Sequence, residues 1–142
     1  MSKHYANAHW DGNLTQGNGK YTLKTSGYEG GLNFSSRFED SKAVSSPEEL
    51  IGAALSSCYS MALAHALDQA GSKPERIETS AEVSLNKGDA GFSITEILLK
   101  TKGKVSGVDK AKFLEIAEKT KQGCPVSRAL TGTTIKLEAE LL

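Results

Sequence analysis

The sequence predicts an α+β protein, because its strand-like segments and its helix-like segments occur in separate blocks along the chain. Short alternating segments come first and a long apolar segment with helix signals follows. A hairpin, a second helix and a final strand complete the order. No internal repeat or linker interrupts it, so we predict a single domain over residues 1–142.

The amino-terminal part has the pattern of an antiparallel meander. Residues 5–10, 20–25 and 31–38 alternate between apolar and polar side chains, and the turn-rich stretches DGN and GYEGG separate them. We therefore expect three short strands before the first helix.

A long helix begins after residue 46. Ser46 is a capping residue, Pro47 suits the first helical position, and Glu49 stands where a capping box places its carboxylate. Apolar and small residues then occupy nearly every face of residues 50–70, until Gly71 supplies a stop. This predicts a buried central helix, with sheet on one side and a further layer on the other.

The second half contains a hairpin, a helix and a strand. Residues 77–85 and 92–98 alternate around a glycine-rich turn, residues 109–122 carry apolar side chains along one helical side, and residues 135–141 alternate again. The predicted buried side of that helix is formed by Phe113, Ile116, Ala117 and Thr120. The expected architecture is antiparallel sheet around the long central helix.

The charges are balanced and dispersed. Lysine plus arginine and aspartate plus glutamate each number 17, and neither sign forms a long block, which argues against nucleic-acid or membrane partners. The first twelve residues contain no secretory type of apolar run, and serines, His65 and Asp68 interrupt the most hydrophobic stretch. We predict a cytoplasmic protein.

The two cysteines differ in their local sequence. Cys58 lies in the middle of the long helix, where a lone cysteine usually serves as a small inert apolar residue. Cys124 follows a helix-ending glycine and precedes Pro125, which predicts a cap position on a short helix through Leu130. Free amide groups there would stabilise a thiolate, although a purely structural cap is an equal alternative. From the residues alone, Cys124 is the better activated thiol.

The sequence offers little for a metal or cofactor. His65 lies seven residues after Cys58, about 10 Å along a helix, so one ion cannot join them and His65 cannot act as a base on Cys58. The chain has no CxxC, HxxxH or carboxylate cluster. We expect no metal and no cofactor, and we expect His65 to be a packed or capping residue.

Arg37 and Glu48 both lie just before the cysteine helix. Taken singly, Arg37 reads as a solvated strand residue and Glu48 as a first-turn glutamate that favours the helix dipole. An arginine held beside a buried sulfur, however, supplies the positive charge that a reactive thiolate needs. A glutamate could then hold that arginine in position.

Four segments resemble one family. They are AHWDG, SRFEDSKAVSSPEELIGAALSSCYSMALAHAL, SLNKGDAGFSITEI and KQGCPVSRAL, and in order and spacing they are similar to the OsmC/Ohr family of thiol-dependent hydroperoxide reductases. The sister branch for organic hydroperoxides carries its arginine nearer the amino terminus, whereas this chain has it in SRFED. The resemblance therefore favours the osmotically inducible protein C branch.

The resemblance implies a two-cysteine peroxidase. Cys58 would attack the hydroperoxide and become a sulfenic acid, and Cys124 would resolve it as a disulfide that an external thiol or dithiol reduces. Arg37 would stabilise the Cys58 thiolate, and Glu48 would position the arginine. The family's order of the two thiols thus reverses the ranking from the residues alone.

The resemblance also implies an intertwined homodimer whose sheets wrap around two long helices. Ten residues of helix separate Glu48 from Cys58 by about 15 Å and roughly 80° around the axis. We therefore hypothesise that the arginine and glutamate beside a given Cys58 include a residue of the other chain.

Two other functions stay open at this point. The chain could bind a lipid-like or other small ligand in a dimer cleft, with incidental cysteines. It could also be a redox sensor, in which a disulfide between Cys58 and Cys124 changes contacts with a protein partner without turnover.

Overall fold

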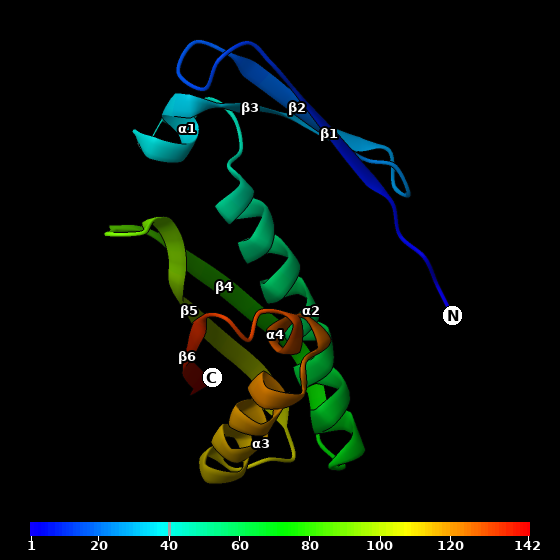
Figure 1. The fold of residues 1–142 in the computed structure, drawn as a ribbon. Coiled ribbons are helices and arrows are strands. Elements are labelled where there is room, and N and C mark those ends of the chain that lie inside the picture. Colours follow the sequence, from blue (N-terminus) through cyan, green and yellow to red (C-terminus); the bar gives the residue numbers. More distant parts are fainter. Residues whose placement is uncertain (40) are drawn as a thin grey trace. The chain divides into compact units, whose positions relative to one another are not determined.

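The computed structural model describes residues 1–39 and 41–142; Asp40, within the SRFED segment, lies outside the described residues. The chain divides into two compact units, Met1–Leu50 and Ile51–Leu142, and each is described by itself. Helix α2 (Pro47–Gln69) begins at the end of the first unit and continues into the second (Figure 1).

The first unit is built on a three-stranded antiparallel sheet. Its strands β1 (Ala6–Asp11), β2 (Asn18–Leu23) and β3 (Tyr28–Asn33) pair in the order of the sequence, which confirms the predicted meander. The turn between β2 and β3 ends at Gly27, whose φ of 83° favours glycine. The prediction of a turn over GYEGG is therefore wrong beyond Gly27, because the remaining four residues belong to β3.

A short helix replaces the end of the third predicted strand. Residues 31–38 were expected to be extended, but β3 ends at Asn33 and α1 covers Phe34–Phe38. The Asn33 side chain accepts a hydrogen bond from the amide of Ser36 at 2.7 Å. Asparagine is a strong helix cap, so this local bond turns the chain where alternation suggested a strand.

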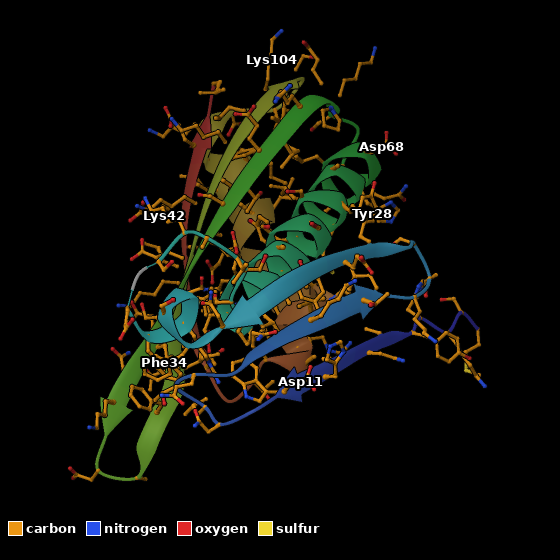
Figure 2. The ribbon with its side chains drawn as sticks, turned by 90° about the horizontal axis from the view of Figure 1, so that it is seen from above. Asp11, Tyr28, Phe34, Lys42, Asp68 and Lys104 are labelled. Carbon is orange, nitrogen blue, oxygen red and sulfur yellow. The ribbon has the colours of Figure 1, made fainter. Side chains whose placement is uncertain are left out.

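Few residues of the first unit are fully buried. Among its described residues, only Gly19 and Glu48 are buried. Several of its large apolar side chains stand largely in solvent, such as Tyr28 at 73% and Tyr5 at 61% exposure, and others, such as Leu32 and Phe34, are half-buried. Tyr28 lies at the start of β3 and extends beyond the ribbon (Figure 2). The sheet therefore has no hydrophobic core of its own.

Helix α2 begins and ends as the sequence predicted. The Ser46 hydroxyl accepts a hydrogen bond from the Glu49 amide at 3.1 Å, and Gly71 follows the helix with a φ of 82°. The fully buried side of α2 within the second unit is formed by Leu55, Tyr59, Leu63 and Leu67. They recur every four residues, which is one stripe of a helix.

The opposite side of α2 is open. Met61 is 75% exposed, and Ala54 and Ser57 are exposed as well. The expectation that α2 is buried on all sides is wrong for this chain alone, because the second unit covers only one stripe. Among the described helices, α2 alone is long and apolar enough to cross a membrane, properties that core helices of soluble proteins share.

The sheet of the second unit is mixed. Strands β4 (Lys73–Gly88) and β5 (Gly91–Ser106) form the predicted hairpin, and β6 (Thr134–Leu141) pairs with β5 in parallel. An antiparallel sheet was expected, so the direction of β6 is a correction. Two helices, α3 (Lys110–Gly123) and α4 (Pro125–Ala129), lie between β5 and β6 and return the chain to the same end.

Helices α2 and α3 pack against one face of this sheet (Figure 1). The buried residues of α3 are the four predicted ones. Gly103 on β5 permits a close contact with α3, because a Cβ atom there would lie 2.6 Å from the Phe113 ring. The hydroxyl of Tyr59 donates to the Ala117 carbonyl at 3.0 Å and links α2 to α3. This core fixes the place where the two cysteines meet.

Candidate active site

The second unit brings the two cysteines together. Cys58 comes from the middle of α2 and Cys124 from the junction of α3 and α4, and their Sγ atoms lie 3.1 Å apart in hydrogen-bond contact. Both thiols are free. A disulfide bond is about 2.05 Å long, so closing the gap requires a shift of about 1 Å. The pair is in position for reversible oxidation.

Cys124 occupies the cap position that its flanking residues predicted. It ends α3, where its amide donates to the Thr120 carbonyl at 2.8 Å, and it precedes α4, which has Pro125 at its start. The residue is fully buried. The hydroxyl of Ser127, in the first turn of α4, is also buried and bonds no nitrogen or oxygen among the described residues, which leaves its proton available to the neighbouring sulfur.

The surroundings of Cys124 favour its thiolate. Burial alone would raise its pKa, but the amide of Ser127, the thiol of Cys58, the hydroxyl of Ser127 and the amide of Val126 together hold the pKa below the ordinary value. Each of these groups donates a hydrogen bond to the charged form and so stabilises it. Amide groups at the start of a helix act in the same direction as its dipole.

Cys58 is shifted the other way. Burial raises the pKa of its thiol, the hydrogen bond with Cys124 raises it further, and the amide of Val126 only partly offsets both. Unlike Cys124, Cys58 keeps part of its surface in contact with solvent. Cys124 thus forms the more stable thiolate, whereas Cys58 is the more accessible residue.

The first unit brings together the other two predicted residues. Nε and Nη2 of Arg37 donate to Oε1 of Glu48 at 3.0 and 2.9 Å. Glu48 is buried, whereas the Arg37 side chain is 38% exposed and lies over the Phe38 ring at 5.2 Å. Glu48 Oε2 is buried without a partner among the described residues. The glutamate therefore fixes one side of the guanidinium and leaves the other side available.

Within one helix, Glu48 and Cys58 cannot touch. Both lie on α2, and ten residues of regular helix span about 15 Å. The predicted site residues therefore form two pairs, a thiol pair in the second unit and an ion pair in the first.

A hollow of about 410 Å³, which the sequence did not predict, lies between α2 and α3. Its lining includes His65, Lys119 and the small residues Ala62 and Ala66, and it reaches Gly123 and Cys124. His65 is exposed there, so its prediction as a packed residue is wrong. Two alanines four residues apart on α2 were the available signal, because small residues on one helix face leave space beside the neighbouring helix.

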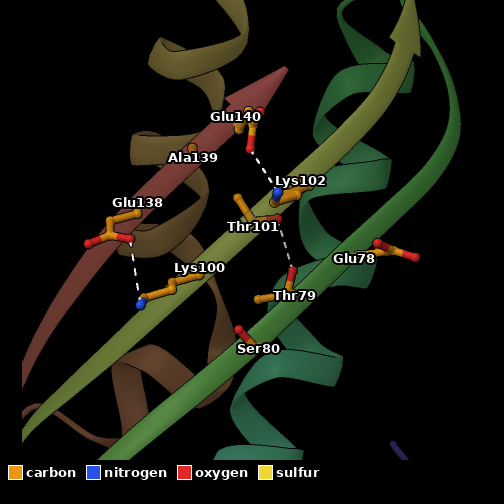
Figure 3. Close-up of a pocket in the computed structure, with 9 residues that line it drawn as sticks. All are labelled: Glu78, Thr79, Ser80, Lys100, Thr101, Lys102, Glu138, Ala139 and Glu140. Atoms are coloured by element: carbon orange, nitrogen blue, oxygen red, sulfur yellow. Dashed lines mark hydrogen bonds and ion pairs between the residues drawn. The ribbon is translucent and has the colours of Figure 1, made fainter. Parts of the chain in front are cut away.

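A second hollow, of about 590 Å³, lies on the sheet β4–β5–β6 (Figure 3). Lysines of β5 and glutamates of β6 alternate across it, with Lys102 to Glu140 at 3.1 Å and Lys100 to Glu138 at 3.9 Å. Beneath them the hydroxyls of Thr79 and Thr101 share a hydrogen bond of 2.9 Å. Opposite charges are paired and exposed, which is typical of a solvated sheet face.

The part of the chain that the structure describes contains no group of three or more histidine, cysteine, aspartate or glutamate side chains that could hold a metal ion. What it does contain is a pair of unbridged thiols on a two-layer α+β scaffold, one of them at the start of a helix. Such an arrangement defines a dithiol redox protein.

Comparison with known proteins gives the family. The family model described as OsmC-like protein matches residues 40–140. The chain is 48% identical over 128 residues to the peroxiredoxin OsmC of Escherichia coli strain K12, covering 87% of this chain and 86% of that one, and equally similar to the peroxiredoxin OsmC of Shigella flexneri. This chain belongs to the OsmC-like protein family, which confirms the resemblance drawn from its motifs.

Solved structures agree on the fold. The organic hydroperoxide resistance protein OhrB of Bacillus subtilis superimposes with a TM-score of 0.75 at 23% identity, covering 95% of this chain and 97% of that one. An OsmC-like protein of unknown function from Vibrio cholerae gives 0.77 at 20% identity, with 98% and 99% covered. The predicted OsmC-like α+β fold is thereby confirmed.

Proposed function

We propose that this protein is a thiol-dependent hydroperoxide reductase that works without metal, flavin or haem. The observation that carries the proposal is the thiol pair, two free sulfurs 3.1 Å apart in a compact core. The names of the relatives point the same way, since one group is named peroxiredoxin and another organic hydroperoxide resistance protein. The substrate class is organic hydroperoxides, and hydrogen peroxide with them.

The proposed cycle has three balanced steps. The thiolate of Cys58 attacks one peroxide oxygen, the O–O bond breaks, and Cys58 becomes a sulfenic acid while the alkoxide takes up a proton as alcohol. The thiolate of Cys124 then attacks the Cys58 sulfur and expels hydroxide, which leaves a disulfide. Two external thiols, or one dithiol, reduce this disulfide and become oxidised themselves.

Accessibility supports Cys58 as the sulfur of the first step. The thiolate is more stable on Cys124, but that sulfur is fully buried and a peroxide must reach the sulfur that it oxidises. Cys58 is part-exposed, so it can meet the substrate. Because its pKa is raised in the isolated thiol pair, it needs a further positive charge.

We assign that charge to Arg37, held by Glu48. The guanidinium is fixed through one carboxylate oxygen, so its remaining N–H groups are free to face a thiolate. We propose that the arginine acts on Cys58 of its own chain or, in a dimer, on Cys58 of the partner. Within this chain Glu48 only positions Arg37 and does not contact sulfur.

A homodimer is part of the same proposal. The first unit leaves several apolar side chains exposed, and Met61 is exposed on one side of α2. Surfaces of this kind mark interaction sites in soluble proteins. In an intertwined homodimer, where both units act as one functional domain, the second copy would cover these side chains. A cytoplasmic location is proposed with it, because thiols that must be reduced in every cycle persist in a reducing compartment.

The test is peroxide consumption by the reduced protein with a dithiol, using cumene hydroperoxide, tert-butyl hydroperoxide and hydrogen peroxide. We expect wild-type protein to consume peroxide, Cys58→Ser to lose consumption, and Cys124→Ser to stop after one turnover as a sulfenic acid or mixed disulfide. Equal inactivity of all three proteins would overturn the proposal and leave a ligand-binding protein as the better description. Sedimentation analysis of the same samples tests the dimer.

A further inference from the structure

The two cysteines of the thiol pair differ in their exposure to solvent. Cys124 is 0% exposed, enclosed by α3, α4 and α2, whereas Cys58 retains an exposed part of its surface. A third thiol that arrives from outside, such as a reductant, therefore meets the two sulfurs very unequally. This matters because a disulfide can be reduced by attack on either of its sulfurs.

We propose that the external thiol attacks Cys58 of the oxidised pair, so that Cys124 is the leaving group and peroxide and reductant act on the same sulfur. The inference rests on the proposed function, since it concerns the disulfide which that cycle forms. It adds the sulfur that the reductant attacks.

The direction of attack supports this assignment. In thiol–disulfide exchange the entering sulfur approaches from the side opposite the leaving sulfur. Cys124 is the buried member of the pair, so a thiolate that arrives from solvent meets Cys58 first, and Cys124 lies on the far side of Cys58. The reverse attack would require an entering thiolate on the side of Cys124, where the hollow between α2 and α3 adjoins a residue that exposes no surface.

The leaving group supports it as well. A thiol of lower pKa leaves faster in disulfide exchange. The amides of Ser127 and Val126 and the Ser127 hydroxyl stabilise a departing Cys124 thiolate, and they lower the pKa of Cys124. Cys58 has only the Val126 amide to offset its burial, so it is the poorer leaving group.

The hollow between α2 and α3 is the alternative route. It extends to Gly123 and Cys124 and could admit a reductant from the other side. Cys124 nevertheless exposes no surface, so a molecule in this hollow does not reach its sulfur without movement of the helices. The experiment below separates the two routes.

The reduction takes two thiol exchanges. An external thiolate forms a bond to Sγ of Cys58, the bond between the two protein sulfurs breaks, and the electron pair leaves on Sγ of Cys124. A second external thiol then attacks the outer sulfur of the mixed disulfide and releases Cys58 as a thiolate. The protein disulfide gains two electrons, and the two external thiols become one disulfide.

The direct test maps the mixed disulfide. The protein is first oxidised with diamide, which needs no peroxidase activity, and is then exposed briefly to 2-mercaptoethanol. Acid quenching, alkylation with N-ethylmaleimide and peptide mass mapping follow. We expect the mercaptoethanol adduct on Cys58 and the maleimide on Cys124. The opposite assignment, or equal amounts of both, would overturn the inference.

A second measurement does not depend on trapping that intermediate. The variants Cys124→Ser and Cys58→Ser each keep one cysteine, which is converted to its mixed disulfide with thionitrobenzoate. Attack of 2-mercaptoethanol on the protein sulfur releases the coloured thiolate. We expect release from Cys58 to be at least about tenfold faster than from Cys124, since access differs so strongly. Equal rates, or faster release from Cys124, would contradict the inference.

The two proposals can fail separately. If diamide-oxidised protein gives the expected adduct on Cys58 but consumes no peroxide, the site of thiol attack stands and the peroxidase function falls. If the protein consumes peroxide but the adduct lies on Cys124, the function stands and the inference falls.

Discussion

The two units of this chain are stabilised in different ways. Residues 51–142 close a core of their own around Leu63, Phe113 and their neighbours, and this core fixes the thiol pair. Residues 1–50 form a regular sheet with no buried apolar side chain among the described residues, yet they carry the Arg37–Glu48 pair. The second unit therefore holds the two sulfurs together by its own core. The first unit, which carries the charged pair, leaves apolar side chains exposed that a further surface could cover.

A core substitution should destabilise the second unit far more than a substitution in the first unit. Leu63→Ala, in the core of the second unit, should lower the free energy of unfolding by about 2–5 kcal/mol, since it leaves a cavity among fully buried side chains. Chemical denaturation followed by circular dichroism measures this. The matched control is Leu14→Ala in the exposed first unit, which should cost less than about 0.5 kcal/mol. Equal losses would break the comparison.

A smaller change sharpens the picture of the second unit. Gly103→Ala places a methyl group 2.6 Å from the Phe113 ring and should cost about 1–3 kcal/mol, because the packed core must shift. Gly132→Ala is the control, since its added Cβ meets no atom within 4 Å. The pair can be compared by thermal unfolding. If both variants melt alike, the contact between Gly103 and Phe113 is looser than described.

The first unit is expected to contribute charge. Arg37→Ala should slow the reaction of the protein with cumene hydroperoxide by at least about tenfold, equivalent to about 1.4 kcal/mol, while the fold stays intact. Stopped-flow loss of free thiol provides the rate. Arg76→Ala removes an arginine that is paired with Glu78 on the surface of the second unit and should leave the rate unchanged. An unaffected rate in Arg37→Ala would mean that another group activates the sulfur.

The pH dependence of the thiols is the smallest effect and the most specific to the second unit. The contacts within the thiol pair hold the pKa of Cys124 below the ordinary thiol value of 9.0 and that of Cys58 above it, so in reduced Arg37→Ala, which lacks the charge assigned to Cys58, thiolate absorbance should rise in two steps on either side of pH 9.0. As pH rises, the first proton leaves Cys124. Cys124→Ser should abolish the lower step.

The same shifts affect stability with opposite signs. Cys124, with a lowered pKa in the folded state, stabilises the fold above pH 9.0, and this contribution is lost as pH falls through its folded value. Cys58, with a raised pKa, stabilises below pH 9.0 and loses this contribution as pH rises through its own folded value. A single titration step at pH 9.0 would contradict both shifts.

Much of the fold could be predicted where the signal is local. The Ser46 cap, the stop at Gly71, the buried side of α3 and the cap position of Cys124 each depend on a few neighbouring residues. The direction of β6 and the open side of α2 could not be predicted, because the first depends on how two helices cross the sheet and the second on which layers cover one helix. Helix α1 was not predicted, because the alternation of residues 34–38 suggested a strand, whereas the Asn33 side chain caps a helix there.

The candidate site was predictable in its residues but not in its geometry. Periodicity placed Cys58 on a helix and flanking residues placed Cys124 on a cap, yet only the packing of α2 against α3 determines that their sulfurs lie 3.1 Å apart. The division between the more stable thiolate and the more accessible sulfur likewise follows from burial, which no local pattern encodes.

Sulfenic acid formation shows which of the two thiols reacts with peroxide. One equivalent of cumene hydroperoxide is added to Cys124→Ser and to Cys58→Ser, and the sulfenic acid is trapped with dimedone and quantified by intact mass. We expect rapid, near-complete labelling of Cys58 in the first variant and little labelling in the second. Faster labelling of Cys124, as its lower pKa alone would favour, would contradict the assignment of Cys58 as the sulfur that reacts with peroxide.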